Sequence, residues 1–172
     1  MAEIRTLMIR GLKLLAWCLC VCPLALQAQA VNEPTQIVET KKPLKLWINP
    51  GFYSAHFNTD KGLRNSNPGL GVEAVFNEDW SATAGTFTNS DDARSNYLGA
   101  YYQPWHWGSY KAGVVGGVFN GYPKAFDGGW FPALLPVVTW EGERFGLNIA
   151  FVPPLQNRLY GAISFQLKLR AP

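Results

Sequence analysis

The chain has 172 residues, of which 48% are hydrophobic and 16% are charged, with 15 basic and 12 acidic side chains. This near balance of charge contains no long basic run, so we expect neither a nucleic acid partner nor an anionic surface as target. The length is that of a single domain.

The first 30 residues predict an export signal. Three basic residues precede the apolar stretch LLAWCLCVCPLALQAQA, which ends in the small residues Ala28 and Ala30. A basic start, a short apolar core and a small-x-small end are typical of a secretory signal peptide, here cleaved after Ala30. The alternative is a retained membrane anchor, but the apolar run is short for a span and contains Pro23. The predicted division of the chain is 1–30 (signal peptide, cleaved), 31–43 (flexible lead-in) and 44–170 (β-barrel).

The predicted mature chain, residues 31–172, contains no cysteine, because Cys18, Cys20 and Cys22 all lie in the signal segment. We therefore expect no disulfide, no thiolate nucleophile and no cysteine metal site. The mature chain keeps 12 basic and 11 acidic residues. No later stretch approaches the roughly 20 apolar residues of a membrane helix, so this chain can cross a membrane only with strands.

Short runs in which polar and apolar residues alternate follow the lead-in, separated by turn residues and without helical periodicity. In the last run, LYGAISFQLKLR, the apolar side chains fall on one face and the polar ones on the other. The run does not show which face is inside. Eight strands are predicted, at 44–57, 69–77, 80–89, 95–103, 109–119, 133–140, 145–152 and 159–170.

The connections after the second, fourth and sixth runs are short, and those after the first and fifth are long. Short turns at one end and longer loops at the other, with eight strands, are typical of the smallest outer-membrane barrels. Tryptophans cluster at the predicted strand ends, as an interfacial girdle requires; these are Trp80, Trp105, Trp107, Trp130 and Trp140. The alternative is a soluble eight-stranded barrel such as a lipocalin. Sparse charge on the strand faces favours the membrane.

We therefore predict an all-β fold, an eight-stranded antiparallel up-and-down transmembrane β-barrel. The predicted location is the outer membrane of a Gram-negative cell, reached through the periplasm. Glu73 shares a strand with Leu70 and Val72 but lies on the other face, so we expect it in the lumen, where polar residues belong. The alternative is a buried hydrogen-bond or ion-pair partner of Lys168 or Arg170.

Three residues are candidates for catalysis. If both termini face the periplasm, His56 ends the first strand, and Asn89 and Ser90 end the third, at the same outer rim. The second histidine, His106, would lie ~25 Å away at the opposite mouth. A serine activated by a histidine, with an amide to orient the imidazole, is an arrangement for acyl transfer. The alternative is that Asn-Ser is ordinary turn chemistry and that His56 is a polar strand end.

The sequence contains no metal-ligand cluster, no phosphate-binding glycine loop and no G-x-S-x-G motif. We therefore predict no cofactor and no metal, and a monomeric protein.

Several stretches resemble the outer-membrane lipid A palmitoyltransferase family (PagP). The resemblance covers roughly residues 44–169. It rests on SAHFNTDK, NPGLGVE, WSATAGTFTNS followed by YLGAYYQPW, FPALLPVV and the closing FQLKLR. The stretch FTNS is similar to the family's F-x-D-S at the end of the third strand.

The resemblance implies an eight-stranded barrel that moves a palmitoyl chain from a phospholipid to lipid A of lipopolysaccharide, with the chain held in an apolar lumen. Ser90 matches the family's serine, and Asn89 stands where the family has aspartate. Either Ser54 or His56 takes the place of the family's histidine. Lipids would enter sideways at strand edges interrupted by proline, and the candidate positions are Pro132, Pro136 and Pro153. Two other readings stay open: a non-enzymatic membrane barrel, and a lipid A deacylase that uses the same histidine and serine.

Overall fold

The computed structural model describes residues 44–124, 126–155 and 160–172, which belong to one compact unit. The predicted signal peptide and lead-in lie outside the described residues. Apart from a short 3-10 turn, η1 (Phe126–Gly128), all regular elements described are strands. The strands are β1 (Lys45–His56), β2 (Ser66–Val75), β3 (Trp80–Thr88), β4 (Arg94–Trp107), β5 (Tyr110–Phe119), β6 (Phe131–Glu141), β7 (Phe145–Val152) and β8 (Ala162–Arg170).

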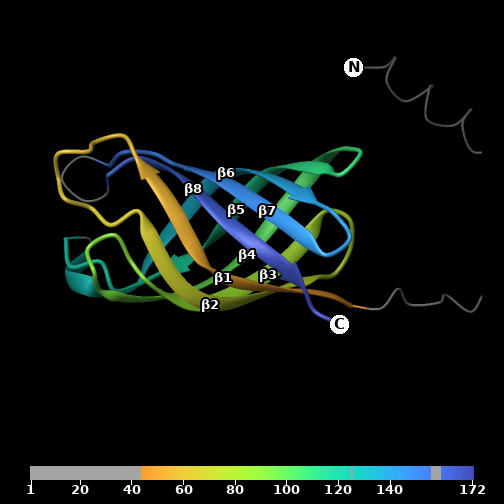
Figure 1. Cartoon of the computed structure of the whole chain (residues 1–172), viewed down its shortest axis with the longest axis horizontal. Helices are drawn as coiled ribbons and strands as arrows, with labels where there is room; N and C mark the ends of the chain where they lie inside the picture. The colour runs from red at the N-terminus through yellow and green to blue at the C-terminus, as the bar shows by residue number, and fades with distance from the viewer. Residues whose placement is uncertain (1–43, 125, 156–159) are drawn as a thin grey trace, which may run out of the picture. The chain divides into compact units, whose positions relative to one another are not determined.

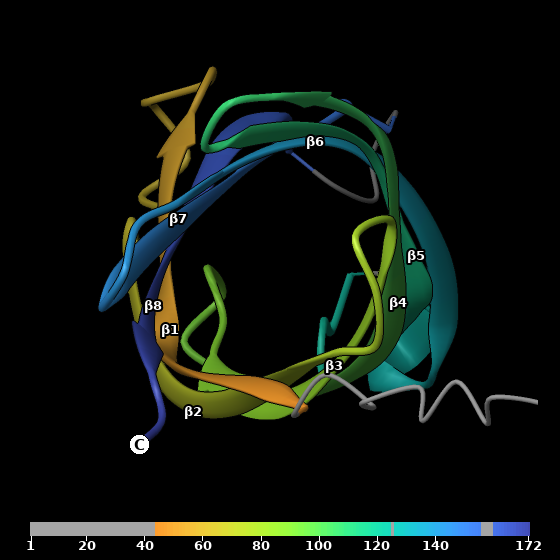
Figure 2. The same cartoon turned by 90° about the vertical axis from the view of Figure 1, so that its right-hand side faces the viewer.

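The eight strands form a closed antiparallel barrel in which each strand pairs with its sequence neighbours and β8 pairs with β1. Figure 1 shows the long connections at one end, and the short turns and the C-terminus at the other; Figure 2 looks along the barrel. We call the end with the long connections the loop end and the end with the short turns the short-turn end. The predicted eight-stranded antiparallel barrel is confirmed.

The boundaries differ most at β4, which the sequence predicted to end near residue 103 but which continues to Trp107. The ladder between β4 and β5 shifts register between Tyr102 and Trp105. Pro104 has no N–H to donate, and a bulge at this point lets the hairpin continue past it. The turn that follows consists of Gly108 and Ser109 alone.

The outward faces of the strands are apolar. In β8, Leu167 and Leu169 are 46% and 38% exposed, whereas Gln166 and Lys168 are 2% and 0% exposed. The same alternation continues around the barrel, with Leu70 and Leu134 among the most exposed side chains. A water-soluble protein buries such residues and exposes lysine. At the short-turn end, where Gln166 and Lys168 lie inside, the distribution of side chains is the reverse of that in a soluble barrel.

Charged side chains avoid the middle of the outer surface. Within the strands, Glu73 and Lys168 lie inside the barrel. The remaining acids and bases occupy the first, second or last position of a strand; they are Lys45, Arg94, Lys111, Glu141 and Arg170. Among the described residues, no helix is long and apolar enough to cross a membrane.

A bulge in β1 decides which of its residues face inward. The register shifts between Asn49 and Gly51, where Gly51 has φ +114°. Before the bulge Trp47 and Asn49 are fully buried, and after it Ser54 is the buried residue. One extra residue moves all following side chains to the other face of a strand. The bulge therefore turns Ser54 and, two positions on, His56 toward the interior.

Candidate functional site

The interior at the short-turn end is closed by a polar network, which we call the polar floor. Its centre is Lys168, which contacts Glu73 Oε1 at 3.0 Å and Glu141 Oε1 at 2.8 Å. Lys45 and Lys111 pair with the other oxygen of Glu141. Both carboxylates thus have cationic partners, which a buried charge requires. Glu73 lies in the lumen as predicted, and the alternative given for it, a buried ion pair with Lys168, is also present.

Neutral polar groups complete the floor. Ser81 Oγ donates to Glu73 Oε1, and Asn148 Nδ2 donates to Glu73 Oε2. Asn148 also donates to Tyr101 Oη and to Gln166 Oε1. These groups come from β2, β3, β4, β7 and β8 and meet in the interior between them. The polar floor therefore spans the interior of the barrel at this end.

Trp47 supports the floor from β1. It is fully buried, and the cations of Lys45 and Lys168 lie 4.7 Å and 5.0 Å from its ring centroid. A cation above an aromatic face is attracted by the ring quadrupole, more strongly where water is excluded. Trp47 differs from the exposed tryptophans at the strand ends, and its interior role was not predicted.

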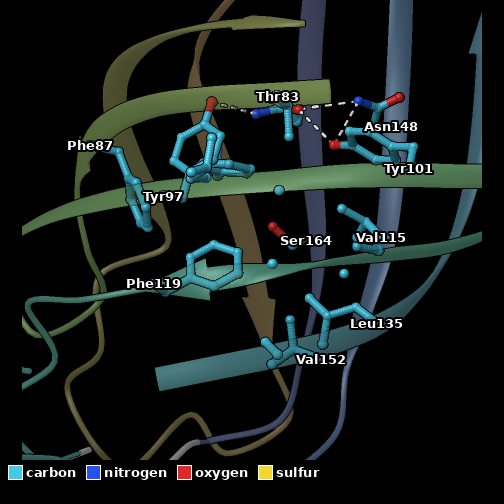
Figure 3. A pocket seen from close by; sticks show the side chains of 18 of the residues that line it. Thr83, Phe87, Tyr97, Tyr101, Val115, Phe119, Leu135, Asn148, Val152 and Ser164 are labelled. Carbon is cyan, nitrogen blue, oxygen red and sulfur yellow. Dashed lines mark hydrogen bonds between the residues drawn. The ribbon is translucent and has the colours of Figure 1, made fainter. Parts of the chain in front are cut away.

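The interior at the loop end is an apolar cavity. It holds about 960 Å³ of empty space, part of it open to solvent. Phe87, Phe119 and Phe131 lie in its wall near the loop ends of their strands, while Tyr101 and Asn148 of the floor form its lower boundary. Figure 3 shows the change from polar to apolar lining, with hydrogen-bonded groups on one side and Val115, Leu135 and Val152 on the other. Ligand pockets are usually lined mainly by apolar side chains, and the lining of this cavity is of that kind, so it suits a hydrocarbon chain.

A second pocket, with about 440 Å³ of empty space that is partly open to solvent, lies at the loop end, and we call it the rim pocket. Its lining includes His56, Ser90 and Asp91. Ser54, Tyr122 and Val152 line both the rim pocket and the apolar cavity. The structure thus brings two of the three predicted catalytic residues, His56 and Ser90, to one pocket beside the apolar cavity.

Asn65 orients the His56 ring. Asn65 Oδ1 lies 2.9 Å from His56 Nδ1, and since an amide oxygen can only accept, Nδ1 is the donor. A neutral imidazole protonated at Nδ1 carries its free lone pair on Nε2, as a general base requires. The sequence reasoning missed Asn65, which lies two residues before the buried Asn67 on the same face of the chain.

Asn89 is fully buried, and its side chain fastens the turn between β3 and β4. Its Oδ1 accepts from the backbone N–H groups of Asp91 and Ala93, at 2.9 and 3.0 Å. Its Nδ2 donates to Ser95 Oγ at 2.9 Å and to the Gly121 carbonyl at 2.8 Å. Two donors and two acceptors are the full capacity of an asparagine side chain, so Asn89 has none left for His56.

Contacts between loops hold Ser90 in place. The Arg64 N–H donates to the Ser90 carbonyl at 3.0 Å. Arg64 also pairs with Asp92 at 3.0 Å, and Lys124 lies 3.7 Å from Asp91. Asp91 and Asp92 thus both take part in ion pairs between the loops.

Tyr122 forms part of the wall between the rim pocket and the apolar cavity. Burial raises the pKa of its phenol, and the nearby Asp91 carboxylate raises that pKa further. Tyr122 therefore stays a neutral hydrogen-bond donor near neutral pH.

Among the described residues no hydrogen bond joins Ser90 to the His56 ring, so the catalytic role predicted for His56, Asn89 and Ser90 stays a prediction. His106 is paired with Asp79 at 2.8 Å, next to the turn between β2 and β3 at the short-turn end. It lines neither cavity.

One strand edge is incomplete. β6 pairs with β5 from Phe131 to Trp140, but with β7 only from Val137 to Glu141. The loop-end half of β6 therefore has no ladder partner on its β7 side within the described chain. This half contains Pro132 and Pro136, which cannot donate a ladder hydrogen bond, and Pro153 directly follows β7. All three predicted gate positions thus lie at this interrupted seam.

Within residues 44–124, 126–155 and 160–172, no group of three or more His, Cys, Asp or Glu side chains could hold a metal ion.

A scan against protein-family models gives no match for the chain, and no curated protein matches it. The structure thus defines a class, a closed eight-stranded barrel with an apolar exterior and an apolar cavity at its loop end. The functional interpretation is based on this cavity and the rim pocket beside it.

Proposed function

We propose that this protein is an outer-membrane acyltransferase that takes an acyl chain from a phospholipid into its barrel and transfers it to lipid A. The observation that carries the proposal is the junction of an apolar cavity above a sealed polar floor with a rim pocket that contains His56 and Ser90. The cavity supplies a place for the chain, and the rim pocket supplies groups for chemistry on its carbonyl end.

The outer surface supports a membrane location. Leu70, Leu98 and Leu134 are 63%, 59% and 67% exposed, and no charged side chain lies on the outer surface between them. Exposed tryptophans lie at the strand ends, where Trp80, Trp105 and Trp140 mark the short-turn end. An apolar band bordered by aromatic rings is the outer surface of a transmembrane barrel.

The chemistry follows from the rim pocket. Ser90 Oγ would attack the ester carbon of the donor while His56 Nε2 takes its proton, and the donor alcohol would leave with that proton. A hydroxyl of lipid A would then attack the acyl-serine in the same way and release Ser90. Asn65 holds the imidazole in the required tautomer. Hydrogen bonds between catalytic groups are often formed only when substrate is bound.

The seam between β6 and β7 provides a route for the chain. A lipid tail arriving from the membrane meets an edge on which β6 and β7 do not pair. Pro132 and Pro136 remove two backbone N–H donors from this edge, which weakens any closure of the ladder. The donor can therefore enter sideways, without its head group crossing the interior.

Mass spectrometry of lipid A from Gram-negative cells producing this chain tests the proposal. Lipid A should gain one acyl chain with the wild-type protein and with Ser109→Ala, a serine at the short-turn end. The gain should vanish with Ser90→Ala. An acyl chain lost in the wild type and restored by Ser90→Ala would instead assign a deacylase.

A non-enzymatic barrel is the second candidate, and one observation favours it. Asn89 is saturated by structural hydrogen bonds, and among the described residues no hydrogen bond joins Ser90 to His56. On this alternative the cavity binds a lipid chain without chemistry. Unchanged lipid A in all strains, with the barrel folded in the outer membrane, would favour it.

A further inference from the structure

Two serines lie opposite one another in the wall of the apolar cavity. Ser54 on β1 and Ser164 on β8 are register partners, and both line the cavity. Directly opposed residues of antiparallel strands have Cβ atoms about 4.5–5.5 Å apart, so both hydroxyls reach the same region. Figure 3 shows Ser164 among the apolar side chains of Val115, Phe119 and Val152.

Both hydroxyls have a proton to donate. Ser54 Oγ accepts a hydrogen bond from Asn67 Nδ2 at 3.0 Å. Ser54 is 9% and Asn67 2% exposed, so the pair is shielded from bulk water. A serine hydroxyl also carries one donor, and the bond from Asn67 leaves this donor free. The Ser164 hydroxyl makes no hydrogen bond with another described residue.

Three other polar side chains of the cavity wall already make hydrogen bonds within the barrel. Thr83 Oγ1 donates to the Val72 carbonyl at 3.0 Å. Tyr101 and Asn148 belong to the hydrogen-bonded floor. An unpartnered hydroxyl in an apolar environment costs free energy unless an acceptor reaches it. The two serines are therefore a pair of opposed hydroxyl donors for which the described residues provide no acceptor, in a wall that is otherwise mainly apolar.

We propose that Ser54 and Ser164 together bind the carbonyl oxygen of an acyl ester or fatty acid whose chain occupies the apolar cavity. This inference rests on the proposed function, because it locates the polar end of the same ligand. A carbonyl oxygen has two lone pairs and accepts one hydrogen bond from each serine. Ser54 also lines the rim pocket, so a carbonyl held there lies next to the pocket that contains His56 and Ser90.

The test uses the full chain folded in detergent micelles with the methyl ester of hexadecanoic acid, labelled with ¹³C at its carbonyl carbon. The barrel-bound ester should give a carbonyl NMR signal distinct from the micellar one and moved downfield by hydrogen bonding. Ser164→Ala should move it part of the way back. Ser54→Ala together with Ser164→Ala should move it to the position of a carbonyl without hydrogen bonds.

Thr83→Val is the matched control, because Thr83 lines the same cavity but its proton is already donated to Val72. It should leave the bound carbonyl signal unchanged. Ser164→Ala breaks no hydrogen bond within the described chain, so it tests the proposal even if the Ser54 variant folds poorly. A bound signal that is the same in wild type and Ser164→Ala overturns the two-serine site but leaves acyl-chain binding intact. No bound signal at all overturns both this site and the proposed function.

Discussion

The ammonium of Lys168 lies 3.0 Å from the Glu73 carboxylate inside the barrel, and the two side chains are 0% and 2% exposed. Their residues are 95 positions apart in the sequence, so the pair joins the second strand to the last. A buried pair of this kind contributes little net stability by itself, but removing one partner leaves an uncompensated charge.

We expect Lys168→Met to destabilise the barrel by about 3–5 kcal/mol, because Glu73 then stays buried without its nearest cation. Urea unfolding followed by tryptophan fluorescence measures this change. The double variant Lys168→Met with Glu73→Gln should recover a large part of the loss. Equal destabilisation in the single and double variants would show that the buried charge is not the cause.

Asn89→Ala and Asn89→Asp should both destabilise the protein by about 1–3 kcal/mol, because each leaves the Ser95 hydroxyl and the Gly121 carbonyl without the Nδ2 donor. Aspartate keeps the two acceptors but cannot donate. The neighbouring Ser90→Ala is the control and should stay within about 0.5 kcal/mol of wild type. If Asn89→Asp were as stable as wild type, the donor bonds would not matter.

Leu70→Arg tests whether the outer surface of the barrel faces lipid or water. In a bilayer an outward arginine near the midplane costs about 2–4 kcal/mol, whereas an exposed residue in water changes stability by about 0.5 kcal/mol or less. We expect the larger value when unfolding is measured from phospholipid vesicles. Leu155→Arg, in the connection after β7 and 50% exposed, should change stability much less. Two equally small effects would contradict the membrane location.

Gly51→Ala should disrupt the bulge in β1. Its φ is +114°, and a Cβ there would lie 2.2 Å from the Asn67 carbonyl oxygen. Gly62 also has positive φ, +62°, but a Cβ there meets nothing within 4 Å. Gly62→Ala should therefore cost only the left-handed penalty of about 1–2 kcal/mol, and Gly51→Ala clearly more. Thermal unfolding compares the two, and equal costs would show that the bulge is not tightly fixed.

Pro136→Val restores a backbone N–H at the seam between β6 and β7. If lipid enters there, we expect less transfer of the acyl chain to lipid A at unchanged barrel stability, because a restored donor helps the ladder to close. Pro104→Val, at the bulge in β4, is the control and should leave transfer unchanged. Faster transfer with Pro136→Val would place the route elsewhere.

Much of the fold could be predicted from sequence because strand alternation is a local property. In β8 each side chain alternates across the strand by geometry alone, so the two faces of Gln166, Leu167 and Lys168 were predictable. The alternation could not tell which face is inside. The exposure of Leu167 and the burial of Lys168 in the closed barrel answer that question.

The candidate site was predictable only in part. The placement of His56 and Ser90 at the same end follows from counting strands, and both do line the rim pocket. Counting strands does not predict which residue each of these side chains hydrogen-bonds to. Asn65 rather than Asn89 contacts His56, because the β1 bulge and the loop after it set the local register.

The sequence by itself determined the number of strands and their alternating faces, and it suggested His56 and Ser90 as candidates for acyl chemistry, since these depend on neighbours along the chain. Only the tertiary structure decided that the interior is divided into a polar floor and an apolar cavity, and that Ser54 faces Ser164. That division depends on which side chains meet when β8 closes onto β1. Such contacts between distant segments are fixed by the register of closure, which no local pattern contains.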